Sequence, residues 1–144
     1  MTQEPVGFIG LGRMGLGMSR NLLEAGVPLV VCDVNAEPIQ TLAAKGASVA
    51  ADPAELAGSV KRLFICVPSE AEAEEVLFGE RGIVAGTNNL TVVDATTMNH
   101  GAVLRLAAQS HSAGLTYSDC PISGMPFRAE NGTLTMMFGG RPEI

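Results

Sequence analysis

The 144-residue sequence has few aromatic residues, few charged residues and no long apolar run. Aromatic residues make up 4% and charged residues 17%, while 47% of the residues are hydrophobic. A chain this apolar and this weakly charged is not expected to be disordered. Without a run of ~18 apolar residues it offers no membrane span. With 15 acidic against 9 basic residues, it lacks the basic surface that holds a nucleic-acid backbone.

Cysteine is also scarce, and its spacing excludes two further classes of protein. Cys32, Cys66 and Cys120 are odd in number, far apart and form no Cys-x-x-Cys pair. Neither a disulfide framework nor a zinc site is expected, which favours a reducing, cytoplasmic location. Residues 1–5 contain an acid and a proline but no basic region, unlike a signal or transit peptide.

Short apolar runs alternate with segments of helical periodicity along the whole chain. The runs predict six strands, at residues 6–10, 29–32, 48–50, 63–67, 90–93 and 115–118. Helices are predicted between them, at residues 14–25, 36–45, 53–57, 71–78 and 101–113. Strands that are apolar on both faces and separated by helices form a parallel sheet covered on both sides.

We therefore predict one domain over residues 1–144, with a doubly wound α/β fold of the Rossmann type. The expected strand order is 3-2-1-4-5-6. A long loop is expected after Asp119, followed by an extra C-terminal strand at residues 134–138. In such sheets ligands bind beyond the carboxyl ends of the strands, so the site residues are sought there.

The loop after the first strand carries a glycine pattern that is typical of dinucleotide binding. Gly10-Leu11-Gly12-Arg13-Met14-Gly15 matches G-x-G-x-x-G and connects a predicted strand to a predicted helix. Gly10 would permit the tight turn, Gly12 the approach of a pyrophosphate and Gly15 close packing of the helix. The helix N-terminus and Arg13 would add positive charge. The alternative is a glycine turn without a ligand.

The second strand ends in an acidic residue at the spacing that this motif requires. Asp33 lies 33 − 10 = 23 residues after Gly10, where an acid accepts hydrogen bonds from the adenosine ribose. We predict that Asp33, Val34 and Asn35 contact the cofactor. Residues 34–44 contain no Arg or Lys to neutralise an extra phosphate, so the cofactor is predicted to be NAD. The alternative role for Asp33 is an N-cap of the next helix.

Three more strand ends contribute candidate site residues. Val67, Pro68 and Ser69 follow the fourth strand and are predicted to contact the cofactor ribose, although a plain turn explains them as well. Asp94-Ala95-Thr96-Thr97 follows the fifth strand, and Thr96 and Thr97 are predicted to lie near the nicotinamide. The alternative is that Asp94 or a threonine caps the next helix.

The loop after the sixth strand is rich in proline and glycine. Ser123 and Gly124 could bind a substrate carboxylate here, with Met125 beside them, although a structural turn is nearly as well supported. Cys120 is the one thiol expected to face this pocket, since Cys32 and Cys66 belong to strands. The other polar groups are interpreted as solvent-exposed: His100, His111, Glu70, Glu72, Glu74 and Glu75.

Three motifs together resemble the β-hydroxyacid dehydrogenases, the family that includes 3-hydroxyisobutyrate, tartronate semialdehyde and 6-phosphogluconate dehydrogenases. The first is the glycine motif at residues 10–15, continued by Met18, Asn21, Leu22 and Gly26. The second is Asp94-Ala95-Thr96-Thr97. The third is Asp119-Cys120-Pro121-Ile122-Ser123-Gly124, followed by Gly132-Thr133-Leu134. The resemblance covers essentially the whole chain.

The resemblance implies that Ser123 and Gly124 hold the acid group of a small hydroxyacid substrate. Met125 stands where the family usually has a second glycine, which makes that side of the pocket larger and more apolar. Members of the family are about twice as long. Their second, all-helical domain supplies a catalytic lysine and most of the contact between subunits.

The two lysines of this chain, Lys45 and Lys61, fall at the wrong edge of the predicted sheet. We therefore expect no catalytic residue here, a general-acid lysine beyond residue 144 and a full-length homo-oligomer. The leading interpretation is the N-terminal cofactor domain of an NAD-dependent 3-hydroxyacid dehydrogenase, nearly inactive alone. The alternatives are an imine reductase on the same scaffold and a non-enzymatic nucleotide-binding module. With either enzyme, the isolated domain is expected to expose apolar surface.

Overall fold

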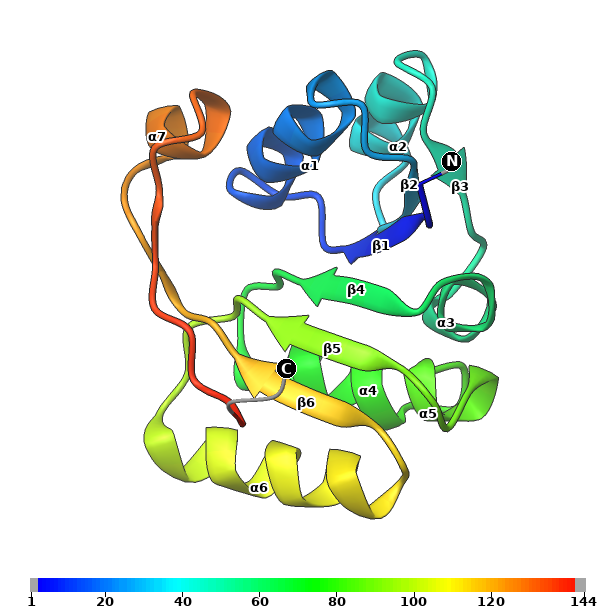
Figure 1. Ribbon diagram of the computed structural model, residues 1–144, viewed down its shortest axis with the longest axis vertical. Coiled ribbons are helices and arrows are strands. Elements are labelled where there is room, and N and C mark those ends of the chain that lie inside the picture. Colours follow the sequence, from blue (N-terminus) through cyan, green and yellow to red (C-terminus); the bar gives the residue numbers. More distant parts are fainter. Residues whose placement is uncertain (1–2, 142–144) are drawn as a thin grey trace.

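Six parallel strands form the main sheet of the computed structural model, which describes residues 3–141 (Figure 1). Their order is β3-β2-β1-β4-β5-β6, so the predicted order 3-2-1-4-5-6 is confirmed. The strands are β1 Val6–Ile9, β2 Leu29–Cys32, β3 Ser48–Val49, β4 Arg62–Ile65, β5 Thr91–Asp94 and β6 Thr116–Asp119. The short central strands are apolar because helices cover both faces.

Helices connect consecutive strands, as expected for a doubly wound fold. They are α1 Gly15–Glu24, α2 Ala36–Ala43, α3 Pro53–Ser59, α4 Glu70–Phe78, α5 Ile83–Gly86 and α6 His100–Ser112. Helix α3 begins as predicted, with Pro53 in its first turn and the Asp52 carboxylate accepting the Glu55 N–H at 2.9 Å. The four-residue helix α5 was not predicted, because one turn carries no periodic pattern.

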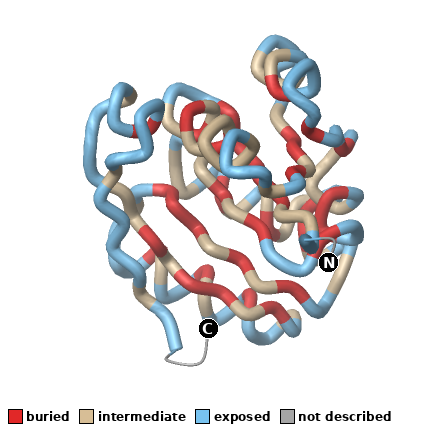
Figure 2. The backbone as a smooth tube through the Cα atoms, turned by 45° about the horizontal axis from the view of Figure 1, so that its top comes forward, coloured by how far each residue is buried: buried red, intermediate tan, exposed pale blue. Residues whose placement is uncertain are grey.

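Two hydrophobic cores lie on opposite faces of the sheet, because successive strand residues point to opposite sides. Ile9 and Ile65 belong to the core beneath α3–α6, whereas Phe8 and Phe64 belong to the core beneath α1 and α2. The Phe8 and Phe64 rings stack with their centroids 5.8 Å apart. Figure 2 shows the buried positions along the strands and the exposed ones in the loops.

The chain beyond β6 differs from the prediction. Residues 120–139, here called the arm, contain β7 Ile122–Ser123, α7 Pro126–Glu130 and β8 Thr135–Met136. The predicted strand at 134–138 is reduced to β8, which pairs antiparallel with β7 and not with the main sheet. The two-residue ladder ends at Gly124, whose φ of +145° turns the chain away from β8.

Within the described part of the chain, no helix combines the length and the apolar character needed to cross a membrane.

Candidate functional site

Five of the six strands end in one row of the sheet. Ile9 pairs with both Cys32 and Ile65, Ile65 pairs with Asp94, and Asp94 pairs with Asp119. The loops that follow these strands therefore leave the carboxyl edge at the same level. All the predicted site residues lie in these loops or in the arm, and this edge is where open α/β sheets bind ligands.

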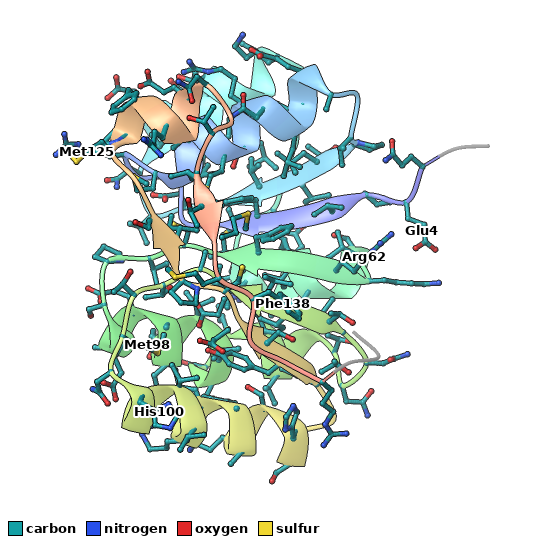
Figure 3. All side chains as sticks on the ribbon, turned by 60° about the vertical axis from the view of Figure 1, so that its left-hand side comes forward. Glu4, Arg62, Met98, His100, Met125 and Phe138 are labelled. Atoms are coloured by element: carbon teal, nitrogen blue, oxygen red, sulfur yellow. The ribbon has the colours of Figure 1, made fainter. Side chains whose placement is uncertain are left out.

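The labelled side chains of Figure 3 mark the two opposite edges of the sheet. Met98, His100 and Met125 lie on the side of the carboxyl edge, whereas Glu4 and Arg62 lie at the amino edge. Lys61 also lies at the amino edge, where its ammonium is 3.2 Å from the Glu4 carboxylate.

The phosphate loop has the geometry that its glycine spacing predicts. Gly10 has a φ of +94°, and a Cβ there would collide with the backbone carbonyl of Cys66. A Cβ on Gly15 would collide with the Gly10 carbonyl, so the start of α1 packs directly against the turn. A Cβ on Gly12 would have no neighbour within 4 Å, which leaves open space in front of the exposed loop backbone.

The N-terminus of α1 is suited to an anion. Met14 is its N-cap and provides no side-chain hydrogen bond, and the first turn holds no acidic residue. The Leu16 N–H already donates to the Gly12 carbonyl at 2.9 Å; the other N–H groups at the start of the helix and the positive end of its dipole favour phosphate oxygens. Arg13 is exposed beside them.

Asp33 connects the ends of β1 and β2. One carboxylate oxygen accepts the Leu11 N–H at 2.6 Å and the other accepts the Asn35 N–H at 2.7 Å. Asn35 is the N-cap residue of α2, so the alternative of Asp33 as that helix's N-cap is wrong. Val34 is 98% exposed next to the carboxylate. A carboxylate therefore lies beside the phosphate loop, at the place where a ribose hydroxyl would donate to it.

The loops after β4 and β5 are joined to each other. The Thr96 hydroxyl accepts the Val67 N–H at 3.2 Å, and Thr96 itself is only 3% exposed. Thr97 is exposed at the same edge. Ser69 caps α4 by accepting the Ala71 N–H at 3.2 Å. Thr96 and Ser69 thus accept hydrogen bonds from backbone N–H groups of the protein, whereas Thr97 is exposed to solvent.

A buried carboxylate supports the loop after β5. Asp94 is fully buried and accepts the Thr96 N–H at 2.9 Å and the Tyr117 O–H at 2.8 Å. Burial raises the pKa of Asp94, although both hydrogen bonds act to lower it. The cap of α6 is Asn99, whose amide oxygen accepts the Ala102 N–H at 2.9 Å, so neither Asp94 nor a threonine caps that helix.

The arm brings the third motif to the same edge. Ser123, Gly124 and Met125 are exposed, with Met125 62% exposed. Helix α7 begins directly after them, because Pro126 fits the first turn of a helix. Helix α7 was not predicted, and this proline, followed by Phe-Arg-Ala-Glu, is the sequence signal that indicates its start.

Two of the three cysteines differ from the prediction: Cys66 lies just beyond the end of β4 and is only partly buried, and Cys120 differs more. Cys120 is 2% exposed and therefore does not face a pocket, and burial raises the pKa of its thiol. Its position is fixed because its N–H extends the sheet, donating to the Asp94 carbonyl at 2.7 Å. Burial also raises the pKa of Cys32 and Cys66 to about 11, so all three thiols stay protonated at neutral pH.

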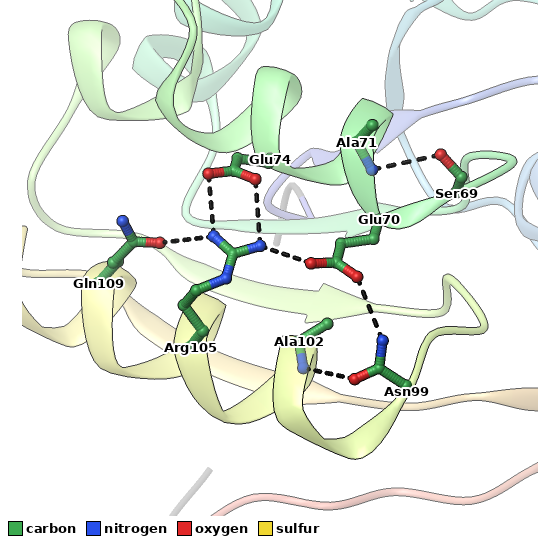
Figure 4. A network of polar contacts seen from close by, with 8 residues as sticks. All are labelled: Ser69, Glu70, Ala71, Glu74, Asn99, Ala102, Arg105 and Gln109. Carbon is green, nitrogen blue, oxygen red and sulfur yellow. Dashed lines mark hydrogen bonds and ion pairs between the residues drawn. The ribbon is translucent and has the colours of Figure 1, made fainter.

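The acidic residues of α4 are not simply a solvent-exposed face (Figure 4). The Arg105 guanidinium of α6 contacts the Glu70 carboxylate at 2.6 Å and the Glu74 carboxylate at 2.9 Å. Glu70 also accepts the Asn99 side-chain N–H at 3.3 Å. The sequence did not reveal this network, because Arg105 lies 31 to 35 residues from its partners. His100 and His111 are exposed, as interpreted.

The described residues include no group of three or more His, Cys, Asp or Glu side chains that could hold a metal ion. Neither lysine lies at the carboxyl edge: Lys61 precedes β4, and Lys45 follows α2 and precedes β3. The open backbone at Gly12, the uncapped α1 and the Asp33 carboxylate instead fit a dinucleotide.

Comparisons with known proteins show the family to which the chain belongs. The mitochondrial 3-hydroxyisobutyrate dehydrogenase of Mus musculus is 36% identical over 140 residues, 96% of this chain and 42% of that protein. The 3-sulfolactaldehyde reductase of Escherichia coli (strain K12) is 37% identical over 139 residues, 96% of this chain and 47% of that protein. The chain thus spans a little under half the length of these relatives.

A solved structure described as Psf3 in complex with NADP+ and 2-OPP matches the fold. It has a TM-score of 0.90 and 34% identity, and the match covers 96% of this chain and 49% of that one. Residues 5–144 match the family described as the NAD binding domain of 6-phosphogluconate dehydrogenase. The resemblance to the β-hydroxyacid dehydrogenases is therefore confirmed, and the chain belongs to the family of NAD-binding domains found in 6-phosphogluconate dehydrogenase.

Proposed function

We propose that this chain is the cofactor domain of an NAD-dependent oxidoreductase that transfers a hydride between a 3-hydroxyacid, or its semialdehyde, and NAD. One observation carries the proposal: the in-register strand ends place the phosphate loop, Asp33, the Thr96–Thr97 loop and the arm at a single edge. Relatives whose names describe a hydroxyacid dehydrogenase and an aldehyde reductase support the reaction class.

The cofactor would be held along this edge from phosphate to nicotinamide. The phosphate loop and α1 would bind the pyrophosphate through backbone N–H groups, with Arg13 adding charge. Asp33 would accept the ribose hydroxyls, flanked by Val34 and Asn35. The nicotinamide half would lie against the remaining predicted residues: Val67, Pro68, Ser69, Thr96 and Thr97. When bound, NAD accepts or supplies the hydride.

Asp33 favours NAD over NADP. Its carboxylate is already within hydrogen-bond distance of two N–H groups, and residues 34–44 hold no cation that could neutralise a 2′-phosphate. A phosphate at that position would face an uncompensated negative charge. The similar structure of Psf3 contains NADP+, so the preference of this chain is measured directly in the test below.

Ser123 and Gly124 would bind the substrate carboxylate through a hydroxyl and a backbone N–H, and Met125 would contact the rest of the substrate. Hydride transfer to or from a carbonyl also needs a proton partner. Neither Lys45 nor Lys61 lies at the carboxyl edge. We place this partner, a lysine, in an all-helical domain beyond residue 144, which would also form the contacts of a homo-oligomer in the cytoplasm.

Binding of reduced cofactors to the full-length protein tests the proposal. Titration with NADH and NADPH, followed by nucleotide fluorescence, is expected to give at least about tenfold tighter binding of NADH. Asp33→Asn keeps the side-chain shape and is expected to reduce that preference, with Glu37→Gln on the exposed start of α2 as the matched control. Tighter binding of NADPH would overturn the NAD assignment and favour the imine reductase alternative.

Activity provides the second arm of the test. The full-length protein is expected to oxidise 3-hydroxyacids with NAD at ~1–10³ s⁻¹, the ordinary range for enzymes. The 144-residue chain is expected to turn over little or nothing. Enzyme-like turnover by the isolated chain would show that its proton partner is already present and would refute the proposed second domain.

A further inference from the structure

The arm reaches across the sheet to a helix that is distant in strand order. It leaves β6, passes the ends of β5 and β4, places α7 beside α1 and returns to β6 (Figure 1). The beginning and the end of the arm lie side by side, because the Gly139 N–H donates to the Asp119 carbonyl at 2.8 Å. The residues proposed to bind the substrate are therefore carried on a segment whose far end rests on α1.

Gly17 and Asn21 form the contact of α1 with α7. A Cβ on Gly17 would lie 2.8 Å from the Ala129 carbonyl carbon and 2.9 Å from the Glu130 nitrogen, so α7 approaches the bare backbone of α1. Four residues later, on the same face of α1, the Asn21 side-chain amide donates to the Ala129 carbonyl at 2.6 Å. The close approach at Gly17 and the hydrogen bond from Asn21 therefore both involve Ala129, which is 1% exposed.

Between Ala129 and its two ends at β6, the arm packs less closely on the domain. A cavity of about 170 Å³ lies between it and the body of the domain, lined in part by Met18, Phe64, Leu134 and Met136. Several large apolar side chains of the arm are half-exposed: Met125, Phe127, Met136, Met137 and Phe138. Between its two ends at β6, the arm is therefore held to the rest of this chain at the α1 contact.

Helix α7 transmits that position to the loop in front of it. The Arg128 N–H donates to the Met125 carbonyl at 2.8 Å, which ties the end of the loop to the first turn of α7. Gly124 fits between α7 and β8, because a Cβ there would lie 2.9 Å from the Leu134 side chain and 3.0 Å from that of Arg128. The position of Ser123, Gly124 and Met125 is therefore tied to that of α7 by these contacts.

We infer that Asn21 is a positioning residue that sets the distance between bound substrate and bound cofactor. The close approach of α7 to Gly17 brings the Ala129 carbonyl within reach of the Asn21 amide. Helix α1 begins at the phosphate loop and holds the arm along the same helix, so one rigid element places both partners of the hydride transfer. Neither Gly17 nor Asn21 belongs to the phosphate loop or to the loop at Ser123–Met125. The inference rests on the proposed function.

The test uses Asn21→Asp in the full-length protein. The substitution preserves shape but replaces the donor with a carboxylate that faces the Ala129 carbonyl. We expect KM for the hydroxyacid to rise, or kcat to fall, by about tenfold to a hundredfold, because catalysis tolerates little misplacement. The Kd for NADH should stay within about twofold, since the phosphate loop is untouched. Glu24→Gln, exposed on the last turn of α1, is the matched control and should change neither.

Limited digestion with trypsin measures the arm directly in the same proteins. Arg128 on α7 and Lys45 after α2 are both exposed. In Asn21→Asp, cleavage after Arg128 should accelerate, while cleavage after Lys45 should keep its wild-type rate. Unchanged hydroxyacid kinetics with unchanged cleavage would overturn the inference, as would an equal loss of NADH and hydroxyacid binding. A wild-type protein that binds no dinucleotide would instead overturn the proposed function, and the inference with it.

Discussion

The phosphate loop is constrained by close backbone packing, to which the Asp33 side chain adds one hydrogen bond at Leu11, whereas the loop after β5 is organised around the buried Asp94 side chain. At the first loop, Gly10 and Gly15 leave no room for a Cβ, and the main chain packs on the carbonyls of Cys66 and Gly10. At the second loop, the buried Asp94 carboxylate holds Thr96 and Tyr117. The first arrangement is therefore sensitive to any added atom, whereas the second depends on individual polar groups that can be removed one at a time.

The contacts between helices differ in how closely they pack. Helices α1 and α7 meet at the bare backbone of Gly17 and through the Asn21 hydrogen bond to Ala129, whereas the exposed Arg105 ion pairs bridge α4 and α6. Arg105, Glu70 and Glu74 are each between 36% and 44% exposed. Exposed pairs of this kind are weak because water and salt screen them. We therefore expect substitutions at the closely packed glycines to reduce stability much more than substitutions in the Arg105 ion pairs.

The largest effect is expected for Gly10→Ala. The left-handed backbone alone costs an alanine about 1–2 kcal/mol, and crowding against the Cys66 carbonyl adds roughly 1–3 kcal/mol. Urea unfolding of the domain and NADH titration of the full-length protein should both show the loss. Gly26→Ala is the matched control, because Gly26 has a φ of +82° but open space around it. Equal losses in the two variants would show that conformation, and not space, dictates glycine at position 10.

A smaller effect is expected for Tyr117→Phe. The change removes the O–H donor from the buried Asp94 carboxylate while the ring volume is retained, which should cost about 1–3 kcal/mol of unfolding free energy. Urea unfolding at neutral pH measures it. A loss no greater than that of an exposed substitution such as Glu24→Gln would show that Asp94 does not need this partner.

The pH dependence of stability provides an independent check on the same pair. Burial raises the pKa of Asp94 in the folded state above the ordinary value of an aspartate, so the folded state keeps this proton after the unfolded chain has lost it. The contribution of this proton to the free energy of unfolding is complete below the pKa of the unfolded chain. It is lost as the pH rises through the pKa of the folded state. Tyr117→Phe removes a bond that lowers the pKa, so the decline should extend to higher pH, and Asp94→Asn should abolish it.

The sequence predicted the parts of the site that depend on local pattern. The glycine spacing at residues 10–15 and the acid at position 33 required only a strand, a turn and a helix, and the structure has that arrangement. The part of the arm before the predicted strand at residues 134–138 was predicted as a loop, because α7 has five residues, too few to show a helical period. The burial of Cys120 and the hydrogen bond from Tyr117 to Asp94 depend on packing between distant segments, which no local pattern encodes.

The smallest effect is expected for Arg105→Met, which keeps much of the aliphatic stem and removes the charge. The bridge from α6 to Glu70 and Glu74 would be lost, yet all three side chains are partly solvated. The fall in Tm should be smaller than for Tyr117→Phe and should shrink further as salt is added, because salt already screens the wild-type pairs. Glu74→Gln should give a similar but weaker response, since Arg105 keeps Glu70. A salt-independent loss of stability as large as that of Tyr117→Phe would show that the Arg105 bridge acts as a buried contact. The proposed difference between the closely packed contacts and this exposed bridge would then be wrong.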